Sequence, residues 1–146
     1  PSSAASDVYK RQPRENHKGK RASMIWQLAQ QMKAGNPRIF KMGEQKRDYI
    51  YVEDVVRANL AAAAAAKTGV FNCGYGAATT FNDLIAILNE VMGLDRTPEY
   101  IDNPYAAAYQ SHTECDMSAT RAALGFTPKF DVRSGIAAYF QSGFLG

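Results

Sequence analysis

The sequence predicts an α/β protein, and three features carry that prediction. Short apolar segments alternate with segments of helical periodicity along most of the 146 residues. Residues 46–60 pass directly from aromatic and β-branched side chains into a helical pattern. Glycine or proline follows the expected helix ends, as at Gly35, Gly69 and Gly93. There is no internal repeat, so strands and helices are expected to alternate in one packed unit.

Before the central run, the sequence predicts a loop, a helix and a strand. Residues 13–20 are polar and contain glycine, which is typical of a loop. A helical pattern opens near Ala22, with Ser23 available as a cap and Gly35 at its end. Its apolar side carries Met24, Ile25, Leu28 and Met32. A short strand is then predicted over residues 38–42.

The central run predicts a strand, a capped turn and a helix. Tyr49–Val52 has the composition of a buried strand. Glu53 and Asp54 offer carboxylates where a helix should begin, and we expect them to cap free backbone N–H groups. The alanines at 61–66 are strong helix formers, and residues 67–69 (Lys-Thr-Gly) predict the end of the helix.

The rest of the chain continues the alternation. Residues 70–76 predict a strand ending in two glycines, for which close backbone packing is a better explanation than a phosphate loop. Thr80 and Asp83 form a capping box at the start of a helix. An extended segment over 98–102 and a loop over 103–113 come next. Asp116 with Ser118, and then Asp131, predict the starts of two last helices.

Composition excludes several classes of protein. Hydrophobic residues make up 46% and charged residues 21%, as in ordinary globular domains. A net charge of +3 requires neither nucleic acid nor a membrane surface. Cys73 and Cys115 lack metal-ligand spacing and are expected to be reduced. No apolar run reaches the roughly 18 residues of a membrane span, and no secretory signal is evident, so we expect a cytoplasmic protein.

Residues 1–12 differ in character from the rest of the chain. Residues 7–12 (DVYKRQ) match the peptide encoded by a transposon-end adapter used in sequencing libraries. We therefore expect 1–12 to be a non-native tail; the alternative is a polar, disordered native one. On either interpretation, residues 13–146 form the portion to be explained.

Two motifs resemble a known family. Arg47–Val56 (RDYIYVEDVV) resembles the RDFIYVDDVV segment of the extended short-chain dehydrogenase/reductases, which include nucleotide-sugar epimerases and dehydratases. Pro13–Lys20 with the following Ala22-Ser23 resembles the GPREx-HKGxMAS loop of the ADP-L-glycero-D-manno-heptose 6-epimerases. The resemblance runs from Pro13 to about Phe140. It implies the C-terminal part of a Rossmann-like fold, with the smaller substrate-binding domain and the last sheet strands.

The resemblance also implies a reaction. These epimerases interconvert ADP-D-glycero- and ADP-L-glycero-manno-heptose at C6″ by transient oxidation with bound NADP. Inversion needs a proton donor and acceptor on each face of the sugar carbon. The resemblance implies that Lys18 serves as the second acid/base and also contacts the cofactor. On charge alone, Lys18 could equally be a solvated loop cation.

Further residues of the motifs align with substrate contacts of the family. Arg47 aligns with the arginine that binds the ADP portion, a task suited to a planar guanidinium. The sequence departs from the enterobacterial pattern at Lys20, which replaces a serine, and at Gln27, which replaces a histidine. Ordinary packing or surface exposure is the alternative for the strand-end residues and the loop tyrosine. The substrate-binding residues implied are Lys20, Gln27, Phe40, Lys41, Met42, Gly43, Arg47 and Tyr109.

The chain lacks two motifs of the family, G-x-x-G-x-x-G after an initial strand and the catalytic Y-x-x-x-K. We expect both in a missing N-terminal part that binds most of the NADP, so that this chain alone is inactive. Tyr49–Val52 and Val70–Cys73 are expected to need covering partners from that part. When full length, the protein is expected to form a homo-oligomer.

Two alternatives stay open. A UDP- or dTDP-sugar epimerase or dehydratase would share the superfamily motifs. A non-catalytic binding module could use Arg14, Lys18, Lys20 and Arg21 to bind nucleic acid, which predicts strongly salt-dependent binding.

Overall fold

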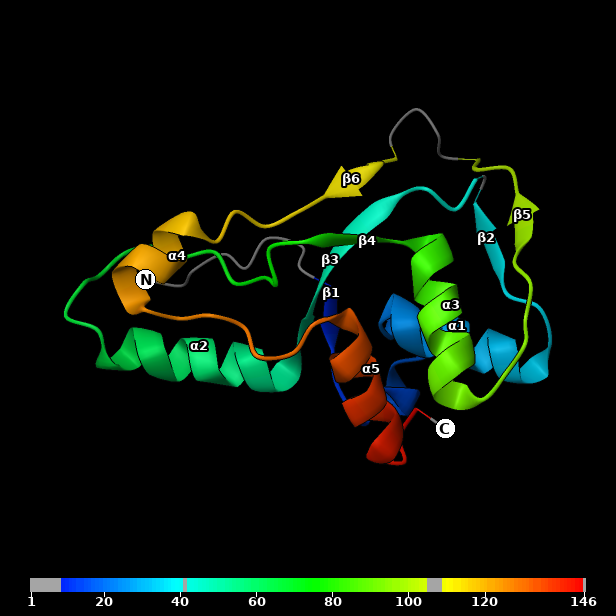
Figure 1. The fold of residues 1–146 in the computed structure, drawn as a ribbon, viewed down its shortest axis with the longest axis horizontal. Helices are drawn as coiled ribbons and strands as arrows, with labels where there is room; N and C mark the ends of the chain where they lie inside the picture. Colours follow the sequence, from blue (N-terminus) through cyan, green and yellow to red (C-terminus); the bar gives the residue numbers. More distant parts are fainter. Residues whose placement is uncertain (1–8, 41, 105–108, 146) are drawn as a thin grey trace.

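A computed structural model describes residues 9–40, 42–104 and 109–145 of the chain. Strand β3 (Lys46–Tyr51) lies at its centre and pairs along its length with three others (Figure 1). β1 (Tyr9–Arg11) and β6 (His112–Thr113) run parallel to β3, and β4 (Ala78–Thr80) runs antiparallel. A second, two-stranded parallel sheet joins β2 (Arg38–Phe40) to β5 (Glu99–Ile101). The predicted α/β class is confirmed.

Strand β1 falls inside the segment expected to be a tail. Tyr9, Lys10 and Arg11 pair in parallel with Tyr49, Ile50 and Tyr51 of β3. Residues 9–11 of the expected tail therefore form a paired strand in the structure. An extended tripeptide can complete the backbone hydrogen bonds of a strand edge whatever its side chains, which explains the pairing. The suspected adapter origin of these residues stays a prediction.

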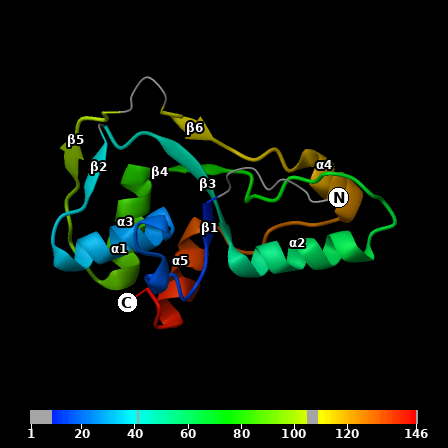
Figure 2. The same cartoon turned by 180° about the vertical axis from the view of Figure 1, so that it is seen from behind.

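Three helices enclose the main core against β3. They are α1 (Met24–Ala34), α3 (Phe81–Met92) and α5 (Val132–Gln141), which Figures 1 and 2 show gathered on one side of the central strand. The predicted apolar faces of α1 and α3 form this core. Its fully buried members include Ile25, Leu28, Met32, Leu84, Leu88, Ile136 and Tyr139.

The capping residues predicted for these three helices are confirmed. Ser23 Oγ accepts a hydrogen bond from Trp26 N at 3.3 Å, and Thr80 Oγ1 accepts one from Asp83 N at 3.0 Å. Asp131 Oδ1 accepts one from Ser134 N at 2.7 Å. Each cap satisfies one of the N–H groups that a helix start leaves free.

The predicted cap of helix α2 (Val52–Ala64) is wrong. The helix begins earlier than expected, after Tyr51, so that Glu53 and Asp54 lie in its first turn. The fully buried carboxylate of Asp54 instead accepts the backbone N–H groups of Lys129 and Phe130, each at 2.9 Å, and pairs with Arg57. Asp54 therefore fastens α2 to the segment before α5.

Residues 70–76 are not a strand in the structure, which corrects a second expectation. Backbone N–H groups of this segment contact side chains from other segments and not a neighbouring strand. Gly74 N lies 3.3 Å from Met117 Sδ, and Tyr75 N donates to Asp48. The segment packs on a small second cluster beside α4 (Ser118–Leu124), which contains Ala58, Met117 and Phe126.

The expectation that Tyr49–Val52 needs outside cover is also wrong, because Tyr49, Ile50 and Tyr51 are buried within this chain. Large apolar side chains that are exposed include Val56, Leu60 and Val70, which are 54%, 65% and 75% exposed. Among the described residues, no helix has the length and apolar character needed to cross a membrane. The same residues contain no group of three or more His, Cys, Asp or Glu side chains arranged to hold a metal ion.

Candidate functional site

Lys18 lies on a short 3-10 segment, η1 (Asn16–Arg21), between β1 and α1. Gly19 has a φ of 52°, in the region that favours glycine, and this kink interrupts the helical turn. The backbone is held on both sides of it, because Lys18 N donates to Glu15 O at 2.8 Å and Ala22 N donates to Gly19 O at 3.1 Å. The side chain of Lys18 is 32% exposed.

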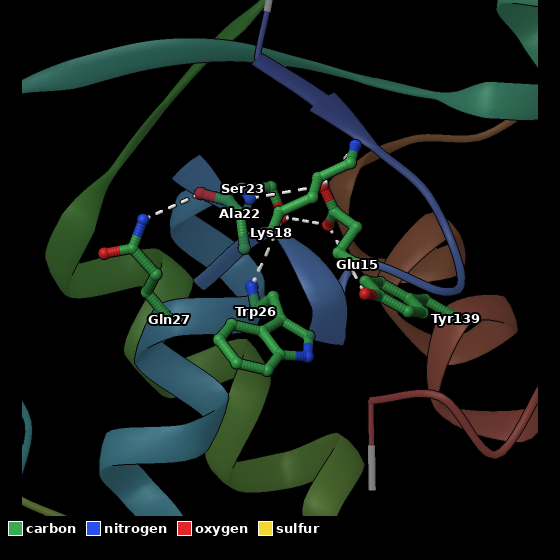
Figure 3. A network of polar contacts seen from close by, with 7 residues as sticks. All are labelled: Glu15, Lys18, Ala22, Ser23, Trp26, Gln27 and Tyr139. Carbon is green, nitrogen blue, oxygen red and sulfur yellow. Dashed lines mark hydrogen bonds and ion pairs between the residues drawn. The ribbon is translucent and has the colours of Figure 1, made fainter. Parts of the chain in front are cut away.

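Glu15 lies at the centre of the contacts around Lys18 (Figure 3). Its side chain is 3% exposed, and its Oε1 lies 3.6 Å from Lys18 Nζ. Oε1 also accepts a hydrogen bond from Ser23 N at 3.2 Å, and Oε2 accepts one from Ser23 Oγ at 2.5 Å. The hydroxyl of Tyr139 donates to Oε2 at 3.3 Å. This one carboxylate thus joins η1, the start of α1 and the middle of α5.

Tyr139 is suited to a donor role in this network. Burial raises the pKa of its phenol above the usual range, and the nearby Glu15 carboxylate raises it further. The phenol therefore keeps its proton at every physiological pH and can donate it to Glu15.

A second cluster brings together three of the predicted substrate-binding residues. Arg47 is buried, and its Cζ lies 5.2 Å from the ring centroid of Tyr109. The rings of Phe40 and Tyr109 meet edge to face, with centroids 5.4 Å apart. Arg47 also donates to Lys46 O at 2.7 Å and to Gln110 O at 2.5 Å. A cation and two aromatic rings from β2, β3 and the segment before β6 are thus in contact.

The other predicted site residues are placed separately. Gln27 donates to Ala22 O at 2.7 Å, so its amide lies over the start of α1 near the Lys18 turn (Figure 3). Met42 is 68% exposed. Gly43 has a φ of 77°, and a Cβ there would lie 2.0 Å from Asn82 Oδ1. Lys41 and the side chain of Lys20 fall outside the described part of the chain.

Asp48, next to Arg47, holds the surrounding backbone. It is 1% exposed and accepts backbone hydrogen bonds from Tyr75, Gly76 and Cys115 at 2.9, 2.8 and 3.1 Å. A Cβ on Gly74 would lie 2.3 Å from the Cβ of Cys115. The prediction that glycine serves close packing here is confirmed.

Sequence reasoning gave no role to Glu15, Asp48 or Tyr139. Glu15 and Asp48 lie inside the two motifs, directly beside Arg14 and Arg47, and surface ion pairs would explain such neighbours equally well. Tyr139 lies 124 residues from Glu15, and no local pattern predicts that contact.

Comparison with known proteins gives a consistent result. Residues 7–74 match the family model described as the NAD dependent epimerase/dehydratase family. An ADP-L-glycero-D-manno-heptose-6-epimerase of Brachyspira hyodysenteriae is 39% identical over 134 residues, covering 88% of this chain and 42% of that protein. The chain therefore spans less than half the length of this relative.

Two solved structures share the fold. The ADP-L-glycero-D-manno-heptose-6-epimerase of Helicobacter pylori is 39% identical, with a TM-score of 0.79 over 91% of this chain and 43% of that one. The UDP-glucose 4-epimerase of Thermotoga maritima, solved with UDP-glucose, is 32% identical, with a TM-score of 0.80 over 93% and 44%.

The match over residues 7–74 and these relatives agree on one class of protein. Over residues 7–74 the chain is similar to the NAD dependent epimerase/dehydratase family, and it has the fold of the extended short-chain dehydrogenase/reductases. Among the proteins of that family, it is similar to the ADP-L-glycero-D-manno-heptose-6-epimerases, as the loop at Pro13–Lys20 predicts.

Proposed function

We propose that this chain is the substrate-binding portion of an NADP-dependent epimerase that interconverts ADP-D-glycero- and ADP-L-glycero-manno-heptose at C6″. The observation that carries the proposal is the convergence of Phe40, Arg47 and Tyr109, three residues the family motifs predict to bind substrate, into one cluster. They come from β2, β3 and the segment before β6, so their meeting does not follow from sequence proximity.

In this proposal the cluster recognises the nucleotide diphosphate. Arg47 carries the permanent charge that a diphosphate requires, and the rings of Phe40 and Tyr109 offer apolar faces beside it. Its hydrogen bonds to Lys46 O and Gln110 O fix the plane of the guanidinium and hold the 109–112 segment on β3. Preorganisation of this kind lowers the cost of binding.

Lys18 is the acid/base in this proposal. Its side chain is partly exposed, so that the ammonium can donate a proton to a sugar oxygen beside it and the neutral amine can accept one. When bound, the nicotinamide cofactor supplies reversible acceptance and donation of hydride. The ammonium of Lys18 is suited to a contact with the cofactor, since it can donate hydrogen bonds to ribose or phosphate oxygens.

Residues 13–146 would then follow a cofactor-binding part carrying G-x-x-G-x-x-G and Y-x-x-x-K. The reading frame upstream of the Pro13 codon in the intact gene tests this. We expect both motifs there, and an open reading frame that starts just before Pro13 would contradict the proposal.

The function is tested with the full-length protein that carries this segment. Incubated with NADP and ADP-D-glycero-manno-heptose, it should give the L-glycero epimer, detected by nuclear magnetic resonance. UDP-glucose and a dTDP-sugar in parallel reactions should stay unchanged. Turnover of the UDP- or dTDP-sugar alone would favour the second candidate, which the similarity to a UDP-glucose 4-epimerase supports.

A further inference from the structure

Glu15 is a heavily bonded buried carboxylate near Lys18, and the proposed reaction does not yet use it. Both of its oxygens are engaged: Oε1 with Ser23 N and Lys18 Nζ, and Oε2 with Ser23 Oγ and the Tyr139 hydroxyl. With only 3% of its side chain exposed, the carboxylate depends on these partners, because an unpaired buried charge is costly.

These contacts fix the orientation of the carboxylate. Ser23 reaches both oxygens, one through its backbone N–H and one through its hydroxyl, so that rotation about the last bond of Glu15 is blocked. Ser23 itself is held as the cap of α1, and Tyr139 is buried in α5. The two helices α1 and α5 therefore hold Oε1 of Glu15 in a fixed position.

Lys18 is the flexible partner. Its side chain is a flexible four-carbon stem and loses rotamer freedom when it is held in one place. The Glu15–Lys18 pair spans one turn, and the backbone bond from Lys18 N to Glu15 O keeps the two residues together. In Figure 3, Glu15 lies between Lys18 on one side and Tyr139 on the other.

We propose that Glu15 is a positioning residue: its carboxylate, held by Ser23 and Tyr139, orients the ammonium of Lys18 for proton transfer to substrate. This inference rests on the proposed function of Lys18. Glu15 touches no substrate in this proposal and acts through the lysine alone. A displacement of about 1 Å at a reacting group can cost on the order of 100-fold in rate, which sets the expected size of the effect.

A purely structural role is the alternative, and Asp54 provides the matched control. Like Glu15, Asp54 is a buried carboxylate that accepts backbone hydrogen bonds and pairs with one cation. Its partners Lys129, Phe130 and Arg57 lie on α2 and before α5, away from the Lys18 turn. Glu15→Gln and Asp54→Asn should both lower stability, and only the first should change the chemistry.

The experiment measures kcat and KM for full-length Glu15→Gln, Asp54→Asn, Lys18→Met and the double variant Glu15→Gln/Lys18→Met. We expect Glu15→Gln to lower kcat about 10- to 100-fold with KM changed less than about threefold, and Asp54→Asn to leave kcat per folded molecule unchanged. In the Lys18→Met background, Glu15→Gln should cause no further loss of kcat, because the group it orients is gone.

If Glu15→Gln does not fold, Ser23→Ala/Tyr139→Phe replaces it, since this pair frees Oε2 and leaves the charge of Glu15 in place. It should lower kcat with KM nearly unchanged. A normal kcat in either variant, beside an inactive Lys18→Met, would overturn the positioning role and leave the proposed function intact. Normal turnover in Lys18→Met would instead overturn the proposed function itself.

Discussion

The carboxylate of Asp48 accepts a hydrogen bond from the backbone N–H of Cys115 at 3.1 Å, across 67 residues of sequence. The same carboxylate accepts the N–H groups of Tyr75 and Gly76. One side chain on β3 therefore holds two separate loops on the strand that also carries Arg47. Asp48 therefore fixes the backbone next to Arg47, which forms a cluster with Phe40 and Tyr109.

Replacing Asp48 with alanine should strongly destabilise the protein. Three partly buried backbone N–H groups would lose a charged acceptor, and bonds to charged groups contribute about 1.5–3 kcal/mol each. Because the losses are not independent, we expect the free energy of unfolding to fall by about 3–5 kcal/mol in total. Urea unfolding of the full-length protein measures this. Thr113→Ala, on the neighbouring β6, is the control and should change the value far less.

Cys115 should be an unreactive thiol despite its partial exposure. Burial, followed by the nearby Asp48 carboxylate, raises the pKa of Cys115 to about 11. At pH 8 only about one molecule in a thousand then carries the reactive thiolate. The rate of alkylation by iodoacetamide should rise tenfold per pH unit up to about pH 11. A plateau near pH 8.5, as for a free thiol, would contradict the assignment.

The same shift predicts a loss of stability in alkali. The unfolded chain ionises this thiol near its ordinary pKa of 9.0, whereas the folded chain keeps it protonated up to about 11. The unfolded state therefore loses its proton first, and the free energy of unfolding should fall as the pH rises from about 9 to 11. Cys115→Ser should remove this part of the pH dependence.

Substitutions at core and surface positions should change the free energy of unfolding by very different amounts. Ile50 is fully buried in β3, and Ile50→Ala should lower the free energy of unfolding by about 2–5 kcal/mol. Leu60, on α2, is 65% exposed, and Leu60→Lys should change stability by less than about 0.5 kcal/mol. Chemical denaturation of both variants gives the comparison. A large loss in Leu60→Lys would show that this side chain is covered.

Much of this fold could be predicted from local patterns. Ser23, Thr80 and Asp131 cap the helices that their positions indicate, because a cap depends only on residues three or four apart. The failures have tertiary causes. The carboxylate of Asp54 accepts hydrogen bonds from the backbone N–H groups of Lys129 and Phe130, not from those of its own helix. In residues 70–76, the N–H of Tyr75 donates to a side chain and not to a neighbouring strand.

For the candidate site too, the sequence predicted some features, and others depend on tertiary packing. The motifs predicted Phe40, Arg47 and Tyr109 as members of one site, but their mutual contacts depend on the pairing of β3 with β6 and on the position of β2, which lies in the other sheet. Glu15 could not be assigned a role, since its partners Ser23 and Tyr139 are brought to it only by the packing of α1 and α5. The motifs therefore supply candidate residues, and the fold decides which of them are in contact.

Arg47→Ala should weaken binding more than chemistry. In the proposed function it removes a charge-assisted contact to the diphosphate, with a loss of about 1.5–3 kcal/mol, which corresponds to roughly a 10- to 150-fold rise in the dissociation constant for ADP-heptose. The turnover of saturated enzyme should fall much less. Isothermal titration calorimetry beside steady-state kinetics separates the two. An unchanged dissociation constant would contradict substrate binding by Arg47. It would leave Arg47 only a structural role, that of holding residues 109–112 on β3.

If Lys18 transfers a proton in the proposed epimerisation, replacing it should remove most of the turnover and leave substrate affinity nearly unchanged. The turnover of ADP-D-glycero-manno-heptose is compared between full-length Lys18→Met and Lys33→Met, the latter replacing an exposed lysine of α1. A general acid/base contributes about 10²–10⁴-fold, so Lys18→Met should lose that much in kcat while its substrate affinity stays within a few-fold of normal. Lys33→Met should turn over normally. If Lys18→Met also turns over at the normal rate, Lys18 is a surface cation and its proposed role in proton transfer is contradicted.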